Sequence, residues 1–299
     1  MNEFNFGRFT PFLISMQVFY KIQELRDYVN KCRLNRMSLG LVPTMGALHN
    51  GHLSLMKGSL SENNITLATI YVNPSQFNNP EDYINYPKTR DSDLEKLEKT
   101  GVQAVFCPHD QEMYEGKPLI NLHFGHLEEV MEGHFRPGHF NGVGIVVAKL
   151  FNIVRPDKAY FGQKDLQQFA VISALNKELK FDIELRCMPI VREKDGLAMS
   201  SRNLLLTAEQ RSEATVFYEA LSRGSELLLA GFSPEKVKTS IEKMFGKHPA
   251  RLEYIEITDA DTLKPLSSLS GYSRVALCIA GHMGKIRLID NTLLTLQQN

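Results

Sequence analysis

Hydrophobic and polar positions follow two periodicities between about residue 37 and residue 191. Short runs of β-branched and other apolar residues look like strands, at 39–42, 65–72, 104–107, 158–161 and 183–191. Stretches with helical spacing separate them, at 54–62, 92–100, 143–154 and 166–179. Parallel strands need such crossovers, so the pattern predicts βαβ units around a parallel sheet.

The pattern changes after about residue 192. Two helical stretches, 207–230 and 233–245, precede strand-like runs at 252–258, 274–280 and 285–290. Helices followed by strands, without strict alternation, indicate a small unit with an antiparallel sheet. We therefore predict an α/β protein with a Rossmann-like parallel-sheet domain over 16–192 and a smaller α+β lid domain over 193–299. The polar segment 192–198 is the predicted join.

The first fifteen residues differ from the rest of the chain. They contain Glu3 and Arg8, lack a long apolar core and lack a small-residue cleavage site, so they make a poor secretory signal. We predict that residues 1–15 are a disordered extension, with Met16 as an alternative translation start.

Composition and charge narrow the kinds of protein. With 34 Lys plus Arg and 34 Asp plus Glu, the chain lacks the positive field of sequence-independent nucleic-acid binding. No apolar run approaches the roughly 18 to 20 residues that cross a bilayer. We predict no nucleic-acid or membrane partner. The scattered cysteines lie in largely apolar neighbourhoods, which indicates reduced core residues of a cytoplasmic protein rather than disulfides or a zinc site. They are Cys32, Cys107, Cys187 and Cys278.

The most informative segment is 40–56, which runs from a strand through Pro43 and Gly46 into a helix. A helix that begins beyond the carboxyl end of a strand offers backbone N–H groups to phosphate. His49 and His52 are three residues apart and face the same way on a helical turn, where their imidazoles can donate hydrogen bonds to phosphate oxygens. They could equally be polar residues that cap the helix.

Other ligands fit this segment less well. A zinc site lacks a Glu between the histidines and an evident third ligand. The chain contains neither a Gly-x-x-x-x-Gly-Lys-Ser/Thr loop nor a Gly-x-Gly-x-x-Gly fingerprint. His49-Asn50-Gly51-His52 resembles the His-x-Gly-His signature of nucleotidylyltransferases and class I aminoacyl-tRNA synthetases. Within that superfamily, residues 43–49 resemble the pantothenate synthetase family.

Two uncharged amides follow the next predicted strand. Asn73 and Gln76 can hydrogen-bond the hydroxyls and carboxylate of a small acid, although an ordinary Asn/Pro-rich turn explains them equally well. Residues 73–77 resemble the family's Asn-Pro-x-Gln-Phe motif. The resemblance implies pantoate contacts at Gln76, Asn73 and Met45, and a β-alanine contact at Gln76.

Segment 155–170 again runs from a strand through a glycine into a helix. Gly162 permits close approach of a nucleotide, Lys164 can pair with phosphates, and Asp165 can cap the helix or hold a ribose or metal. A solvated lysine beside a simple N-cap is the alternative. Residues 161–168 resemble the family motif Phe-Gly-x-Lys-Asp-x-Gln-Gln, which implies a pantoate contact at Gln168.

A loop near the predicted join combines hydroxyls with a guanidinium. Met199, Ser200, Ser201 and Arg202 suit a mobile clamp on a triphosphate, or else form a polar linker. The resemblance places them at the family's Lys-Met-Ser-Lys-Ser-type loop and Val191 in the adenine pocket. It implies ATP contacts at Met45, Gly46, Ala47, Leu48, His49, Asn50, Gly51, His52, Gly162, Gln163, Lys164, Asp165, Val191, Met199, Ser200, Ser201 and Arg202.

Two further residues are weaker candidates. Arg136 is a candidate phosphate or substrate contact, although its loop also suits a structural lid. Asp93 matches an acidic position near the family's metal, but Ser92 replaces the neighbouring acid, and a helix start explains both residues. We therefore predict Mg²⁺ mainly through the ATP phosphates, with Asp93 as an optional ligand.

The resemblance covers about residues 17–291 and implies ATP-dependent condensation of pantoate with β-alanine, through a pantoyl adenylate, in pantothenate and coenzyme A biosynthesis. It also implies a homodimer. The residues implied in catalysis are His52, His49, Lys164, Ser200, Ser201 and Arg202. The alternatives are a nucleotidylyltransferase with a phosphorylated acceptor, which would need more cations beside the acceptor, and a nucleotide sensor without activity.

Overall fold

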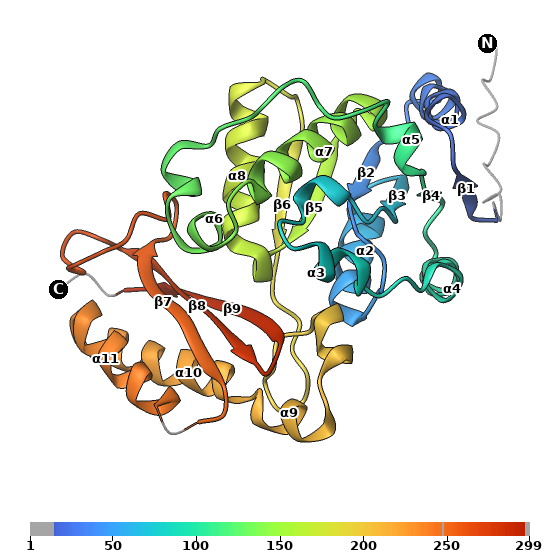
Figure 1. The fold of residues 1–299 in the computed structure, drawn as a ribbon. Helices are drawn as coiled ribbons and strands as arrows, with labels where there is room; N and C mark the ends of the chain where they lie inside the picture. Colours follow the sequence, from blue (N-terminus) through green and yellow to red (C-terminus); the bar gives the residue numbers. More distant parts are fainter. Residues whose placement is uncertain (1–14, 247, 297–299) are drawn as a thin grey trace, which may run out of the picture.

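The computed structural model describes residues 15–246 and 248–296. The predicted extension lies outside the described residues, except for Ser15. The described part contains two sheets, one parallel and one antiparallel, and helices that cover them (Figure 1). The predicted fold class, a Rossmann-like parallel sheet followed by a smaller α+β unit, is confirmed. The boundary at residue 192 stays a prediction.

The larger sheet is wholly parallel and has the order β1-β4-β3-β2-β5-β6. Five of its strands match the predicted runs within a few residues. The additional edge strand, β1, pairs with β4 and has only three residues, too few to show a period. The strands are β1 (Gln17–Phe19), β2 (Leu39–Val42), β3 (Ile65–Thr69), β4 (Ala104–Phe106), β5 (Lys158–Gly162) and β6 (Glu184–Met188).

Helices cover both faces of this sheet, and the strands divide their side chains between two cores. Leu41 and Leu67 pack against α1 (Ile22–Leu34), α7 (His139–Val154) and α8 (Leu166–Glu178). Val42 and Ala68, the next residue on each strand, pack against α2 (Asn50–Glu62) and α4 (Arg90–Thr100). Burial on both faces explains why these strands read as continuous apolar runs. Helix α1 was not among the predicted elements. The prediction that all four cysteines lie in the core is wrong for Cys187, which is exposed because β6 is an edge strand.

Shorter helical segments complete this part of the chain. The α-helical ones carry no full apolar period, which explains why sequence periodicity did not identify them. They are α3 (Pro80–Ile84), α5 (Asp110–Met113) and α6 (Met131–Phe135), with 3-10 turns η1 (Pro74–Gln76), η2 (Gly125–Glu128), η3 (Gln163–Asp165) and η4 (Ser201–Leu205).

The smaller sheet is antiparallel, with the order β7-β8-β9. Its strands are β7 (Arg251–Asp259), β8 (Arg274–Met283) and β9 (Ile286–Thr295). The predicted stretch 207–230 forms two helices, α9 (Ala208–Glu213) and α10 (Val216–Leu229), and α11 (Pro234–Phe245) follows. Val275, Leu277 and Ile279 pack on the side of α10 and α11.

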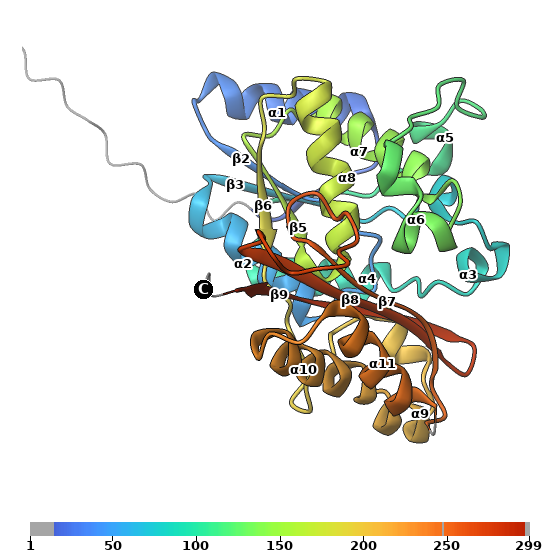
Figure 2. The ribbon, with the colours of Figure 1, turned by 90° about the vertical axis from the view of Figure 1, so that its left-hand side faces the viewer.

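The other face of the small sheet packs against the larger unit, so the small sheet lies between two layers (Figure 2). Ala276 and Cys278 of β8 contact the core formed with Phe140 and Leu166. A buried ion pair reinforces the joint, since Arg287 Nη1 and Nη2 each lie 2.7 Å from a Glu132 carboxylate oxygen. The alternation of side chains along β8 thus serves two different interfaces.

Candidate active site

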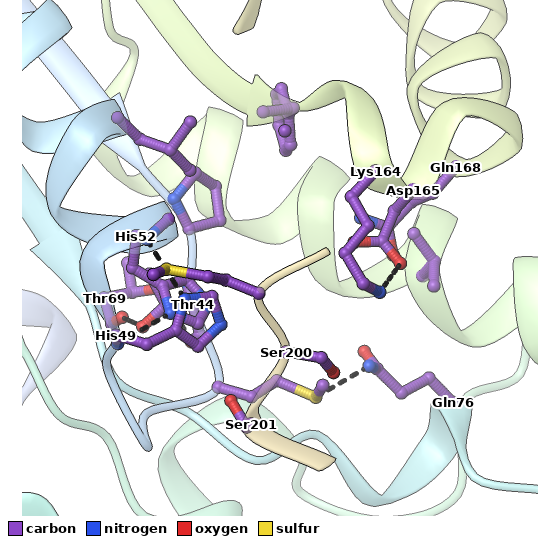
Figure 3. A pocket seen from close by; sticks show the side chains of 18 of the residues that line it. Thr44, His49, His52, Thr69, Gln76, Lys164, Asp165, Gln168, Ser200 and Ser201 are labelled. Carbon is purple, nitrogen blue, oxygen red and sulfur yellow. Dashed lines mark hydrogen bonds and ion pairs between the residues drawn. The ribbon is translucent and has the colours of Figure 1, made fainter. Parts of the chain in front are cut away.

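The site lies where the strand order of the parallel sheet reverses. The chain runs outward from β2 through β3 to β4 and then returns to place β5 on the other side of β2. Ligands bind at such a switch point because the connections diverge there and leave a crevice beyond the carboxyl ends of the strands. The loop after β2 and the turn after β5 line one pocket at this edge (Figure 3).

A buried carboxylate shapes the loop after β2. Gly46 and Ala47 have positive φ values, 83° and 49°, which turn the backbone N–H groups of Ala47 and Leu48 toward Asp93. Both N–H groups donate to Asp93 at 2.8 Å, and the Thr89 hydroxyl donates at 3.0 Å. The Asp93 side chain is 0% exposed. This geometry supports a role for Asp93 in holding the loop and does not support the suggested metal contact.

The two histidines cap α2 and face the pocket. His49 Nδ1 accepts from Gly51 N at 3.1 Å, and His52 Nδ1 accepts from His49 N at 3.4 Å. Burial, followed by the charge of Lys164, lowers the pKa of His49 to about 4. Burial, followed by His49 and Lys164, lowers the pKa of His52 to about 3. Both rings are neutral near pH 7, and each has its proton on Nε2 because Nδ1 is the acceptor.

Lys164 lies in the single turn η3, between the end of β5 and α8. Its side chain is 17% exposed, and Nζ lies 3.9 Å from Asp165 Oδ1. Lys164, Asp165 and Gln168 line the pocket. The side chain of Gln163 does not, because its Nε2 donates to Asn291 Oδ1 at 3.2 Å.

The two amides after β3 are buried in the pocket wall. Asn73 is 1% exposed and Gln76 is 8% exposed. Asn73 Nδ2 donates to the Gly142 carbonyl of α7 at 3.2 Å and to Gln76 Oε1 at 3.3 Å. Gln76 Nε2 lies 2.8 Å from the Met45 sulfur, a weak acceptor, so a substrate oxygen could replace this contact (Figure 3).

Residues 199–202 close one side of the pocket. The Ser201 hydroxyl donates to the Ala47 carbonyl at 3.0 Å, which ties this segment to the loop after β2. Ser200 accepts from the Arg202 backbone N–H at 3.3 Å. Arg202 Nη2 lies 2.8 Å from Asp82 Oδ2, so its guanidinium has a carboxylate partner in this structure.

Most of the predicted site residues thus meet in one pocket. Those that line it are Met45, His49, Gly51, His52, Asn73, Gln76, Gly162, Lys164, Asp165, Gln168, Val191, Met199, Ser200, Ser201 and Arg202. Those that do not are Gly46, Ala47, Leu48, Asn50, Gln163, Asp93 and Arg136. Arg136 lines a smaller adjoining cavity, where its Nη1 lies 3.1 Å from His139 Nε2.

Comparison with known proteins identifies the family. Residues 17–293 match the sequence model described as Pantoate-beta-alanine ligase. The chain belongs to this family. The pantothenate synthetase of Moorella thermoacetica is 47% identical over 281 residues, covering 93% of this chain and 99% of that protein. The pantothenate synthetase of Cytophaga hutchinsonii is 44% identical over 281 residues, covering 92% and 98%.

Solved structures agree with this assignment to the pantoate-beta-alanine ligases. The crystal structure of pantothenate synthetase from Thermus thermophilus matches with a TM-score of 0.87 at 39% identity, covering 93% of this chain and 99% of that one. The pantoate-beta-alanine ligase of Francisella tularensis, complexed with beta-gamma ATP and beta-alanine, matches with a TM-score of 0.79 at 34% identity, covering 93% and 97%.

Several residues that line the pocket were not predicted from the sequence. The missed residues include an apolar wall on α7, a buried tyrosine, and the segment before Val191; these are Val143, Val146, Val147, Leu150, Tyr86, Pro189 and Ile190. Helix α7 was predicted, but its apolar residues gave no sign of which ones face a ligand rather than the core. Only the paired glycines Gly142 and Gly144 hinted at a close approach on this helix.

Proposed function

We propose that this pocket carries out the ATP-dependent condensation of pantoate with β-alanine, which gives pantothenate, AMP and pyrophosphate. The supporting observation is that His49, His52 and Lys164 share one pocket with the neutral amides of Gln76 and Gln168. Cationic and N–H donors suit the phosphates of ATP, whereas neutral amides suit a hydroxy acid. A phosphorylated acceptor would instead require further cations on the amide side.

The proposed reaction has two steps. An amine does not displace oxide from a carboxylate at useful rates, so the acid needs a better leaving group. The pantoate carboxylate attacks the α-phosphorus of ATP and pyrophosphate leaves, giving pantoyl adenylate. The nitrogen of β-alanine then attacks the acyl carbon. The bond between this carbon and the bridging oxygen breaks, AMP leaves with that oxygen, and the nitrogen loses a proton.

The histidines and Lys164 act on the first step by stabilising charge. With Nδ1 used as an acceptor, the Nε2–H of His49 and of His52 remains available to phosphate oxygens in the pocket. Because burial holds the pKa of each imidazolium far below neutrality, both rings are neutral near pH 7. The N–H of a neutral imidazole is a very weak acid, so it donates this hydrogen bond without transferring its proton. Lys164 supplies a positive charge, and such preorganised donors stabilise the developing negative charge on the leaving group.

The remaining pocket residues position the substrates. We assign pantoate to Met45, Asn73, Gln76 and Gln168, with the apolar wall of α7 against its methyl groups. Gln76 also contacts β-alanine. The adenine lies against Val191 and Met199, and the phosphates extend toward Ser200, Ser201 and Arg202. Arg202 reaches them from its ion pair with Asp82.

Mg²⁺ enters this proposal together with the nucleotide. Among residues 15–246 and 248–296, no three His, Cys, Asp or Glu side chains lie close enough together to hold a metal. The pocket therefore suits an ion that would be held mainly by phosphate oxygens. Asp165 is the carboxylate of the pocket wall that could add a protein ligand. Such an ion would neutralise phosphate charge.

An assay with single omissions tests the proposal. AMP formation is measured with ATP, pantoate and β-alanine, leaving out each in turn, and we expect no AMP when any one is missing. In a single turnover, pyrophosphate release should require pantoate but not β-alanine. A strict amine requirement for pyrophosphate release would argue against a discrete adenylate, and ATP binding without any turnover would indicate a sensor.

We also propose that two copies of the chain associate. Leu119 is 99% exposed and Ile120 is 63% exposed, in the segment between α5 and η2, and a second copy would cover such apolar side chains. Sedimentation at micromolar concentration should give a dimer, and Leu119→Lys should shift it toward monomer. A monomeric wild-type protein would overturn this.

The cytoplasmic location stays a prediction. None of the described helices has the length and apolarity that a bilayer crossing needs.

A further inference from the structure

The side chain of Asn291, on β9 of the small sheet, reaches the turn that carries Lys164. Its Nδ2 donates to the carbonyl oxygens of Gln163 and Lys164, each at 2.9 Å. Its Oδ1 accepts from Gln163 Nε2 at 3.2 Å. Asn291 is 3% exposed, so these bonds are shielded from water and all of its side-chain polar atoms are engaged.

The turn η3 is short and has no side-chain cap. It is a single 3-10 turn of three residues, and its N-cap, Gly162, has no side chain to cap it. The nearest carboxylate to the Lys164 ammonium is that of Asp165, at the loose distance of 3.9 Å. The direction of the lysine side chain therefore depends on how its backbone is held, and Asn291 holds two successive carbonyl groups of that backbone.

The neighbouring residue on β9, Asp290, contacts the chain segment that follows Val191. Arg192 Nη1 and Nη2 lie 2.6 and 3.0 Å from the two carboxylate oxygens of Asp290. Arg192 Nη1 also donates to the Gly196 carbonyl at 3.0 Å. Arg192 lies between Val191 and the segment 199–202, both of which line the pocket. Two adjacent residues of β9 therefore contact two pocket-lining segments: Asp290 the one at Arg192, and Asn291 the turn that carries Lys164.

We propose that Asn291 is a positioning residue for adenylate formation, acting through Lys164 from the C-terminal sheet. This inference rests on the proposed function, because Lys164 must contact the phosphates for its position to matter. A displacement of about 1 Å can cost on the order of 10²-fold in rate. The second step, aminolysis of the adenylate, releases no pyrophosphate and should depend much less on Lys164.

The test separates the two half-reactions. In Asn291→Asp the volume is kept, but a carboxylate oxygen faces the carbonyl groups of Gln163 and Lys164 and repels them. We expect single-turnover pyrophosphate release to slow by about 10- to 100-fold. Aminolysis of supplied pantoyl adenylate should change less than about twofold. Asn291→Ala, which only removes the bonds, is the second variant if the first fails to fold.

A neighbouring residue on the same strand provides the control. Thr292 pairs with Leu277, whose side chain packs on the opposite face of the sheet, toward α10 and α11. Thr292→Val should leave both half-reactions unchanged. Equal loss of both half-reactions in the Asn291 variants would indicate a merely structural role and overturn the proposal, as would unchanged pyrophosphate release.

A double variant shows whether the effect passes through Lys164. If it does, Asn291→Asp combined with Lys164→Ala should release pyrophosphate no more slowly than Lys164→Ala alone. Multiplicative losses would contradict the proposed route. The wild-type omission assay runs alongside. If the wild-type protein forms no AMP, the proposed function itself fails. If the wild type forms AMP but the Asn291 variants affect both half-reactions to the same extent, only this inference is rejected.

Discussion

The two histidines of the pocket combine roles that sequence reasoning treated as alternatives. Capping of α2 uses Nδ1 of each ring, and this use fixes the proton on Nε2, on the side open to a ligand. A cap and a phosphate donor are therefore compatible in one side chain. The cap explains why a side chain with an acceptor atom stands at the third position of the helix.

At the scale of single residues we expect His52→Ala to slow pyrophosphate release by about 10²- to 10³-fold, the usual cost of losing such a donor. His134→Ala, at an exposed position on α6, is the matched control and should leave the rate unchanged. Both are measured by single-turnover release with saturating pantoate. A loss of less than about threefold in His52→Ala would remove this residue from the catalytic group.

A second expectation concerns His139, which is 5% exposed. Burial, followed by the charge of Arg136, lowers the pKa of His139 to about 3. Between about pH 6.5 and 3 the unfolded chain binds a proton that the folded chain does not, so stability present above pH 6.5 is lost as the pH falls. Urea unfolding at pH 7.0, 6.0 and 5.0 should show this decline.

The variant His139→Gln isolates this contribution. It removes the titrating group while retaining a side chain that can reach the Gln76 carbonyl, which His139 Nδ1 contacts at 2.7 Å. We expect the unfolding free energy of His139→Gln to fall less steeply than that of the wild type between pH 7.0 and 5.0. An identical slope in the two proteins would show that His139 titrates normally in the folded state.

At the scale of elements, the position of Gln76 depends on how closely α7 approaches η1. A Cβ added at Gly142 would overlap the Ser75 carbonyl oxygen and lie 2.5 Å from the carbonyl carbon. These are backbone atoms and cannot rotate away. Glycine is thus required here for packing, and this packing places the side-chain amides of Asn73 and Gln76 beside the apolar wall of the helix.

We expect Gly142→Ala to lower the unfolding free energy by about 1–3 kcal/mol, the range for overpacking, and to raise the KM for pantoate more than the KM for ATP. Gly116→Ala is the control, because a Cβ there meets nothing within 4 Å. Urea unfolding and initial rates check both effects. Unchanged stability and an unchanged KM for pantoate would show that α7 can shift without disturbing Gln76.

At the scale of the whole molecule, a largely buried ion pair between Glu132 of α6 and Arg287 of β9 joins the larger unit to the small sheet. Burial alone would raise the pKa of the Glu132 carboxyl, but the hydrogen bonds and charge of Arg287 lower it to about 2. The Tyr254 hydroxyl donates to the same carboxylate at 2.9 Å. Without Arg287, the buried Glu132 carboxylate would keep only the more distant Arg136, at 3.7 Å, and the Tyr254 hydroxyl. A buried charge left with such weak partners costs more than the original pair contributes.

We therefore expect Arg287→Leu to lower the unfolding free energy by about 3–5 kcal/mol. Arg274→Leu, which breaks an exposed pair with Asp261, should cost less than about 1 kcal/mol. Adding Glu132→Gln to Arg287→Leu should recover part of the loss by removing the charge. Denaturant unfolding of the four proteins decides this, and equal losses for Arg287→Leu and Arg274→Leu would contradict it.

Several features of the site had no local signal. Asn291 lies in a strand whose pattern indicated only an antiparallel sheet, and its partner Gln163 is 128 positions away. Asp93 read equally well as a helix start or a metal ligand, because the N–H groups it binds belong to another segment. Arg202 was predicted to bind the triphosphate, and nothing in the sequence indicated its partner Asp82, which lies 120 positions away.

By itself, the sequence determined the βαβ alternation, the switch to an antiparallel sheet, and the motifs that meet at the phosphate site. These follow from periodicity and from short runs whose chemistry is local. Only the tertiary structure decided the strand order, the wall of α7, the partners of Asp93 and Arg202, and the reach of β9 into the Lys164 turn. Such contacts join residues distant along the chain, and their geometry depends on the packing of whole elements.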